Sequence, residues 1–333
     1  MSAYALPSHV LSAIEAEFVH RPRASIMAGQ SQLSEAYRSG RPSSEAVRTD
    51  EAALAYVAAR MPATFASMTR ALEEIEVLCP DFQPSSVLDI GAGPGTATFA
   101  AMNRWQSIEN ARFIEPNSAM RAIAQRLFAT GPLKPDFAET LGTAPVDLAL
   151  FGYVLVEQPL AQAVRNVEAT LAVSRMTVIV EPGTPEGFAR INAIREAVRH
   201  NKTHHILAPC THSVACPMRD GQWCHFNVRL PRTRLHQSIK AAEAPFEDER
   251  FTYLVLSRDP PSDATGTWSR TMADPRATKA TVTLKVCNAD GLGELAIPTR
   301  DRPAAKHAKG TSWGDRLSNA ALTRTQAPSI KPK

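Results

Sequence analysis

The chain has 333 residues, of which 44% are apolar, so it is long enough to bury the core of a full-sized globular domain. No stretch approaches the roughly 18 consecutive apolar residues of a membrane span, and residues 1–10 lack the basic and apolar regions of a signal peptide. We therefore expect a cytoplasmic protein without membrane contact. Thiols stay reduced there, so the five cysteines favour metal binding or chemistry over disulfides.

The net charge is only +4, but positive charge is concentrated in two regions. Residues 199–240 hold seven Lys or Arg against Asp220, and residues 300–333 hold eight against Asp301 and Asp315, so each region carries +6. Basic side chains that neutralise phosphates release counterions, so two such regions favour RNA as a partner. For either region alone, a solvated surface is the alternative. The candidate RNA-binding residues are Arg229, Arg232, Arg234, Lys306 and Lys309.

Chain order gives the predicted organisation. Helical spacing marks residues 11–19, 31–38, 51–61 and 63–78, with a linker rich in Gly, Pro and Ser at 38–45. From residue 87 to 182, short apolar runs alternate with amphipathic stretches, which predicts a parallel sheet covered by helices on both faces. A helix follows over 185–200, then the last strands of the sheet at 224–230 and 251–258, and a hairpin over 280–298 with its turn at 288–293. The predicted parts are a helical region (1–80), an α/β domain (81–260) with a cysteine-rich insertion (204–226), a small β module (261–300) and a basic tail (301–333).

The segment VLDIGAGPG at residues 87–95 places three glycines between the first strand and its helix. Glycine lets a ligand lie against the backbone, and the helix amino terminus supplies oriented N–H groups. Glu115 ends the next strand, where a carboxylate can accept hydrogen bonds from ribose hydroxyls. The dinucleotide fingerprint requires Gly or Ala at position 96, which is Thr96, so NAD is disfavoured. The pattern resembles class I S-adenosylmethionine methyltransferases, and the expected cofactor contacts are Asp89, Gly91, Ala92, Gly93, Gly95, Glu115 and Pro116.

A third segment, VDLALFGYVLVEQP at 146–159, predicts a fourth strand and the loop where this fold brings the methyl group to its acceptor. Tyr153 is the catalytic candidate there, and simple packing of Tyr153 against a helix is the alternative. Methyl transfer from a sulfonium needs mainly an aligned nucleophile and a dry site. The loop lacks the Asn-Pro-Pro-aromatic signature of enzymes that methylate exocyclic amines. Cofactor binding is therefore better supported by the sequence than turnover.

Four later cysteines, Cys210, Cys216, Cys224 and Cys287, are spaced C-x5-C-x7-C-x62-C. Cys210 follows Pro209, as in RNA cytosine-C5 methyltransferases, but the Asp expected before that Pro is absent and no second nucleophile motif accompanies it. A structural zinc site, with His212 or His225 replacing one thiolate, normally shows tight C-x2-4-C pairs. An iron–sulfur cluster is larger and tolerates a wide loop plus one distant ligand. The spacing alone supports a zinc site and an iron–sulfur cluster about equally.

Several long motifs together resemble one family, the methyltransferase-like assembly factors of the mitochondrial small ribosomal subunit, in their bacterial branch. The resemblance covers about residues 34–315 and rests on LAYVAARMPATFASM, VLDIGAGPGTA, VIVEPGTPEGF, the cysteine segment, WCHFNVRLPRTRLH, FEDERFTYLVLSR and the late WGD at 313–315. It implies a class I methyltransferase (Rossmann-like) sheet, S-adenosylmethionine and a [4Fe–4S] cluster on the four cysteines. It also implies binding to small-subunit ribosomal RNA.

Three functions remain open on this sequence. The first is a ribosome assembly factor that uses the fold, the cofactor and the cluster as structural parts, and that is a monomer off the ribosome. The second is an active S-adenosylmethionine-dependent ribosomal RNA methyltransferase. If the chain is an enzyme, this is the activity we expect. The third is a small-molecule methyltransferase with a structural zinc site, which the two basic regions disfavour.

Overall fold

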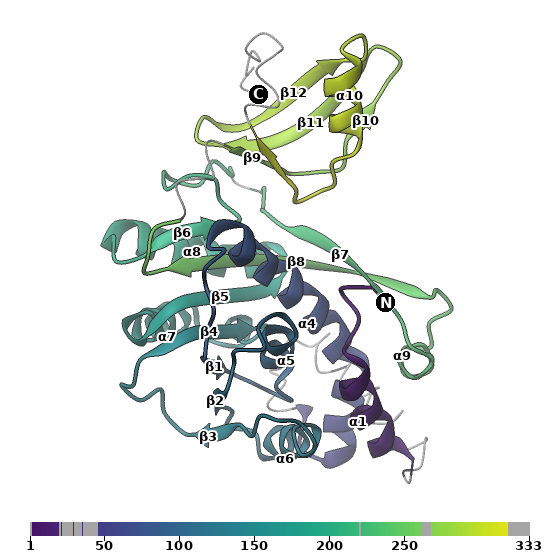
Figure 1. Ribbon diagram of the computed structural model, residues 1–333, viewed down its shortest axis with the longest axis vertical. Helices are drawn as coiled ribbons and strands as arrows, with labels where there is room; N and C mark the ends of the chain where they lie inside the picture. Colours follow the sequence, from purple (N-terminus) through teal and green to yellow (C-terminus); the bar gives the residue numbers. More distant parts are fainter. Residues whose placement is uncertain are drawn as a thin grey trace.

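The computed structural model describes residues 2–19, 21, 29, 35, 46–219, 221–261 and 268–318. Apart from residue 35, the predicted helix at 31–38 and the linker at 38–45 lie outside these residues. The described chain forms a larger α/β part and a smaller antiparallel module at one end of it (Figure 1). The glycine loop belongs to the larger part, and Cys287 belongs to the module.

One long helix replaces two of the predicted ones. Helix α4 spans Asp50–Leu78, with the Thr49 hydroxyl accepting from the Ala52 N–H at 3.2 Å as its amino-terminal cap. Pro62 lies inside this helix, where it removes one backbone donor and normally causes a kink or break. Residues on every side of α4 are buried, so tertiary packing compensates for the lost bond. The prediction of separate helices at 51–61 and 63–78 was wrong for this reason.

The central sheet has the order β3-β2-β1-β4-β5-β8-β6, with β7 also paired to β8. Its first five strands are parallel, β8 runs antiparallel to β5, and β6 and β7 run antiparallel to β8. The antiparallel strand inserted before β6 defines the class I methyltransferase variant of the doubly wound fold, which confirms the predicted fold class. The strands are β1 Ser86–Ile90, β2 Asn110–Ile114, β3 Asp136–Ala138, β4 Val146–Gly152, β5 Ser174–Pro182, β6 His205–Ala208, β7 Phe226–Pro231 and β8 Phe246–Ser257.

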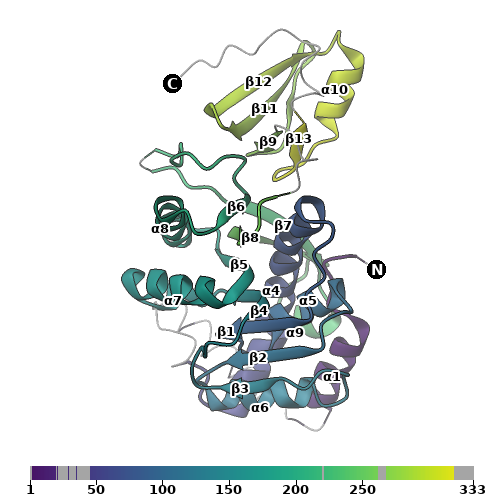
Figure 2. The same ribbon diagram turned by 60° about the vertical axis from the view of Figure 1, so that its left-hand side comes forward.

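Helices cover both faces of this sheet (Figure 2). Along β5, Val178 and Val180 pack into one hydrophobic cluster with α4, whereas Ile179 packs into a second cluster beneath α7 and α8. Burial on both faces explains the unbroken apolar runs of the central strands. The other helices of this part whose bounds the structure describes are α1 Ser8–Phe18, α5 Thr96–Arg104, α6 Ser118–Leu127, η1 Leu155–Glu157, α7 Leu160–Val173, α8 Pro185–Asn201 and α9 Arg234–Lys240.

Over residues 268–318, the module forms a five-stranded antiparallel sheet and one helix. Its hairpin has the predicted place, with only residues 289 and 290 between the two strands. The predicted boundary at residue 300 does not hold, because a helix and a strand from the range assigned to the basic tail pack on this sheet. The elements are β9 Trp268–Thr271, β10 Arg276–Ala277, β11 Thr281–Asn288, β12 Gly291–Pro298, α10 Arg302–Lys309 and β13 Arg316–Ser318.

A buried ion pair joins the module to the larger part. Arg270 of β9 donates from both terminal nitrogens to the carboxylate of Glu74 on α4, at 2.7 and 2.9 Å. The same guanidinium donates to the Gly314 carbonyl at 2.7 Å and to the Pro209 carbonyl at 3.0 Å. Burial by itself would raise the pKa of Glu74, but the charge and hydrogen bonds of Arg270, assisted by Arg70, lower it to about 2.

We predict that Glu74→Gln lowers the free energy of unfolding by about 3–5 kcal/mol, because it leaves a buried guanidinium without its counter-charge. The stabilisation by Glu74 is complete above pH 4.5 and is lost as the pH falls from 4.5 toward 2, because its pKa is lower in the folded chain. Denaturant unfolding of wild type and variant at several pH values measures both effects. The unfolding free energy of the variant should not show the loss between pH 4.5 and 2 that Glu74 causes in wild type.

Glu76→Gln is the matched control, since Glu76 lies on the same helix and pairs with Arg104 at the surface. An exposed pair contributes about 0–1 kcal/mol, so this variant should unfold almost like wild type. If Glu74→Gln and Glu76→Gln lowered the free energy of unfolding equally, the buried Arg270–Glu74 pair would not be the important contact.

Candidate functional site

A pocket of about 240 Å³ lies at the carboxyl ends of β1 and β4. Its floor is the glycine loop, where Gly91 and Gly93 have φ values of 66° and 54° that favour glycine. A methyl group on Gly93 would meet nothing within 4 Å, so the backbone there is open to a ligand. The lining residues are Tyr56, Gly91, Gly93, Glu115, Pro116, Asn117, Met120, Gly152, Tyr153, Val154, Glu157 and Gln158.

The Glu115 carboxylate is fixed at the edge of this pocket. One oxygen accepts the Gly93 N–H at 2.7 Å, and the other accepts the Asn117 N–H at 2.8 Å. Burial raises the pKa of Glu115, although these two backbone donors partly oppose the change. The residue therefore joins the glycine loop to the end of β2, and each oxygen keeps a lone pair that can face a ligand.

Three of the predicted cofactor contacts do not line the pocket: Asp89, Ala92 and Gly95. Asp89 is buried and accepts from the Thr98 N–H and hydroxyl at 3.2 and 2.8 Å, and burial raises its pKa to about 7. A methyl group on Gly95 would come within 2.5 Å of the Phe128 ring. Asp89, Ala92 and Gly95 therefore support the glycine loop from its core side. The sharp turn from strand to helix directs these positions into the core and the intervening ones toward the pocket.

Tyr153, the catalytic candidate, lines the pocket from the end of β4 with a φ of 60°, unusual for a residue other than glycine. Its hydroxyl donates to the Glu249 carboxylate at 2.9 Å and lies 3.1 Å from the Ser67 hydroxyl. Burial, with the nearby Glu249 charge, raises the pKa of Tyr153 well above 10. The phenol is therefore a protonated group held in one place, and not a ready base.

The opposite wall of the pocket depends on a residue that sequence reasoning missed. Glu181 at the end of β5 is fully buried and accepts the Leu155 and Val156 N–H groups at 2.8 and 3.1 Å. Burial raises its pKa to about 8. It thereby fixes η1, whose neighbours Val154 and Gln158 line the pocket. The available signal was a carboxylate at the end of an apolar run, just before Pro-Gly.

The four predicted cysteine ligands lie around one small cavity of about 30 Å³. Cys210 and Cys216 come from the loop after β6, Cys224 lies just before β7, and Cys287 lies on β11 of the module. The structure thus brings together residues from three separate segments. The fifth cysteine, Cys79, caps the end of α4 and does not line this cavity.

Two arginines border the cysteine cavity, Arg195 and Arg270. Arg195 of α8 donates to the Cys210 sulfur at 3.1 Å and to the His212 and Val214 carbonyls at 3.1 and 2.6 Å. It therefore holds the cysteine loop from the side of the main sheet, and sequence reasoning missed it. Burial raises the pKa of the Cys216, Cys224 and Cys287 thiols, the last to about 12.

Metal binding itself is not shown. Among the residues that the structure describes, no group of three or more His, Cys, Asp or Glu side chains is placed to hold a metal ion. His212 and His225, the alternative zinc ligands, do not join such a group, although the His212 ring nitrogen lies 4.0 Å from the Cys287 sulfur.

The predicted RNA-binding residues fall into two groups. Arg229 pairs with Asp248 through two contacts of 2.7 Å, and Arg232 pairs with Glu247 at 3.2 Å. Counting charges over residues 199–240 overlooked these β8 acids, because the pairing of β7 with β8 brings them opposite the arginines. The other three predicted residues, Arg234, Lys306 and Lys309, are exposed and make no ion pair with any residue that the structure describes.

The strand order, the glycine loop and the fixed acidic residue after β2 define a methyltransferase-like protein of class I. A family model described as mitochondrial small ribosomal subunit Rsm22 matches residues 50–318. The chain belongs to this family.

Two named relatives come from eukaryotes. The chain is 28% identical over 293 residues to the ribosome assembly protein METTL17, mitochondrial, of Homo sapiens, covering 81% of this chain and 63% of that protein. It is 22% identical over 342 residues to the Rsm22-cox11 tandem protein 2, mitochondrial, of Schizosaccharomyces pombe, covering 85% of this chain and 45% of that protein. The chain thus spans less than two thirds of each relative.

Solved structures give only distant likenesses. Magnesium protoporphyrin IX methyltransferase from Synechocystis, with bound SAM, aligns at 12% identity and a TM-score of 0.37, covering 64% of this chain and 85% of that one. Ribosomal protein L11 methylase from Lactobacillus delbrueckii aligns at 15% identity and a TM-score of 0.36, covering 58% and 80%. The fold assignment therefore rests on the strand order.

The prediction of a cytoplasmic location is contradicted, because the matching family and the relatives are described as mitochondrial. That prediction used only the absence of a recognisable leader and of apolar spans, which does not distinguish these compartments. Within the described residues, no helix is long and apolar enough to cross a membrane.

Proposed function

We propose that the chain is an assembly factor of the small ribosomal subunit that binds S-adenosylmethionine and an iron–sulfur cluster. The family match over residues 50–318 carries this proposal, and the human relative bears the name of a ribosome assembly protein. Exposed Arg234, Lys306 and Lys309 are the proposed contacts to ribosomal RNA phosphates. Arg229 and Arg232 contribute less, because their carboxylate partners already offset their charge.

Methyl transfer to ribosomal RNA is the second candidate function. The pocket favours it in one respect, since the loop that would receive an acceptor is held rigidly by Glu181 and Tyr153. The Tyr153 hydroxyl keeps its proton and donates it in a hydrogen bond to Glu249, so it orients groups and does not abstract protons. A ring nitrogen or other self-sufficient nucleophile would suit such a site.

S-adenosylmethionine would supply an electrophilic methyl group on its sulfonium. Glu115, which lines the pocket beside Pro116, would accept the two ribose hydroxyls. Gly91 and Gly93 let the cofactor approach the backbone closely, and a methyl group on Gly91 would come within 2.3 Å of the Val154 side chain. Asp89, Ala92 and Gly95 support this loop from the protein interior.

The cysteine set fits an iron–sulfur cluster in its donor chemistry, because four thiolates are the usual ligands of a [4Fe–4S] group. Cys210, Cys216, Cys224 and Cys287 border one cavity, and two guanidiniums beside it would offset the negative charge of the bound group. Such a group would order the irregular loop after β6, which has little apolar surface of its own. Zinc is the alternative occupant.

We predict that Glu115→Gln weakens S-adenosylmethionine binding by about tenfold, because an amide accepts fewer ribose hydrogen bonds than a carboxylate. Isothermal titration calorimetry of the full chain measures the affinity. Glu109→Gln serves as the control, since Glu109 is exposed one residue before β2 and outside the pocket. Equal affinity of the Glu115 variant and wild type would contradict the assignment of this pocket.

Protein purified without oxygen should contain about four iron atoms and absorb broadly near ~400 nm, with bleaching by dithionite. Cys216→Ser and Cys287→Ser should each lose most of the iron, because each removes one ligand. Cys79→Ser should keep the iron, because Cys79 lies away from the cavity. Zinc in place of iron would overturn the cluster, and neither metal in wild type would overturn the whole metal site.

Cells that lack the protein should accumulate immature small ribosomal subunits. Expression of the wild-type chain should restore subunit maturation. If assembly is the function, the methylation map of small-subunit RNA is the same with and without the protein. If methyl transfer is the function, one methyl group disappears and returns with wild type but not with Gly93→Arg, whose side chain would fill the pocket. Normal subunit maturation without the protein would contradict the proposal.

A further inference from the structure

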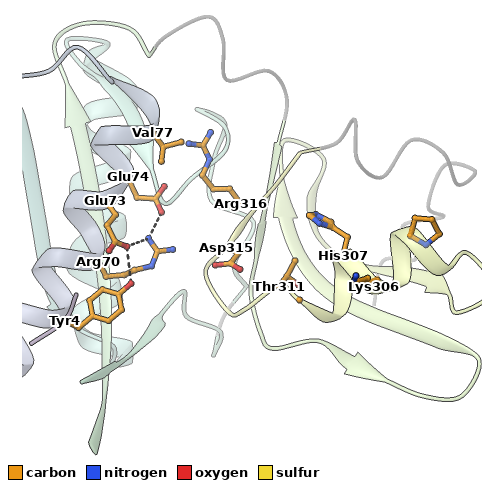
Figure 3. A pocket seen from close by; sticks show the side chains of 12 residues that line it. Tyr4, Arg70, Glu73, Glu74, Val77, Lys306, His307, Thr311, Asp315 and Arg316 are labelled. Carbon is orange, nitrogen blue, oxygen red and sulfur yellow. Dashed lines mark hydrogen bonds and ion pairs between the residues drawn. The ribbon is translucent and has the colours of Figure 1, made fainter. Parts of the chain in front are cut away.

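A third cavity, of about 900 Å³, opens between the larger part and the module (Figure 3). Tyr4, Arg70 and Val77 form one wall, the last two from α4. Lys306 of α10 and Arg316 of β13 belong to the opposite wall. Neither the glycine-loop pocket nor the cysteine cavity shares these residues, so this cleft is a separate feature.

The acidic residues of the cleft are largely matched. Glu74 is held by Arg270, and Glu73 lies 3.6 Å from Arg70 and 3.5 Å from Arg104. Asp315 accepts the Ser312 N–H at 2.8 Å. Arginines therefore offset the charges of Glu73 and Glu74, whereas Asp315 meets only a neutral N–H.

The module wall carries two cations, Lys306 and Arg316, and the charge of Arg316 helps to lower the pKa of Glu74 across the cleft. Lys306 is exposed and makes no ion pair with any residue that the structure describes. Arg316 lies over the Trp268 ring at 4.1 Å, and its buried Nη1 has no hydrogen-bond partner within the described chain. Arg316 also lines the cleft, so its guanidinium can attract an anion bound there.

The facing wall offers surface for bases. The Tyr4 hydroxyl donates to Glu73 at 3.2 Å, which fixes the ring at the edge of the cleft. Val77 is 59% exposed on the same wall. Aromatic and apolar surface facing cations is the arrangement that binds single-stranded nucleic acid, with bases on one side and phosphates on the other.

We propose that this cleft binds a single strand of RNA, with its phosphates on Lys306 and Arg316 and its bases toward Tyr4 and Val77. The inference rests on the proposed action on the small ribosomal subunit and assigns a place for RNA contact. The Arg270–Glu74 pair fixes the width of the cleft, because Glu74 lines it while Arg270 borders the cysteine cavity behind it. The two walls are therefore preorganised for the strand.

Fluorescence anisotropy with a labelled single-stranded RNA of about twelve nucleotides tests this site on the full chain. Lys306→Glu and Arg316→Gln should each raise the Kd roughly tenfold and lower the slope of log K against log salt by about 0.7 per lost contact. Lys306 is exposed, so its variant should keep the melting temperature of wild type. Lys279→Glu is the matched control, an exposed module cation without an ion pair in the described chain and outside the cleft.

The outcomes separate this proposal from the wider one. If wild type binds the oligomer and both cleft variants bind it equally well, the cleft is not the site, while action on the ribosomal subunit stands. If Lys279→Glu weakens binding as much as Lys306→Glu, the effect is general charge and the cleft assignment is overturned. If wild type binds neither the oligomer nor isolated small subunits, both the proposed RNA binding and the assignment of the cleft are contradicted. Equal competition by a duplex of the same length would exclude a single-strand site.

Discussion

The buried pair of Arg270 and Glu74 is the constraint on which the arrangement of the two parts depends. A guanidinium taken out of water must have all of its donors satisfied, and here they reach α4, the Gly314 turn and the Pro209 carbonyl just before Cys210. One side chain from the module therefore fixes a helix, a turn and the cysteine loop relative to one another. The desolvation cost is large, so the pair is evidence for a defined orientation more than for net stability.

The same pair separates two cavities of different chemistry. On one side lie four thiols and Arg195, and on the other lies the cleft between α4 and α10. Arg270 connects the two directly, because it donates to the Pro209 carbonyl beside Cys210 and to Glu74, which lines the cleft. Proposed metal binding and proposed RNA binding are thus neighbours in space, although their residues are far apart in sequence.

The glycine-loop pocket shows how buried carboxylates build a binding site without facing the ligand. Asp89 holds the start of α5 through Thr98, and Glu181 holds the loop after β4. Both are hydrogen-bonded and buried, and their pKa values are raised to about 7 and about 8 by that burial. Glu115, by contrast, lines the pocket itself.

The sequence alone determined the features that depend on neighbours along the chain. The strand and helix alternation, the glycine loop with Glu115 and the hairpin of the module all follow from local spacing, since periodicity and turn residues act within a few positions. The four cysteines were singled out by spacing, but only the fold brings Cys287 beside the other three. Tertiary structure also decided that Pro62 stays inside a helix, that Arg229 and Arg232 are neutralised by β8, and that a cleft exists at all. Each of these results from contacts between residues distant in sequence, where burial and charge pairing outweigh local preference.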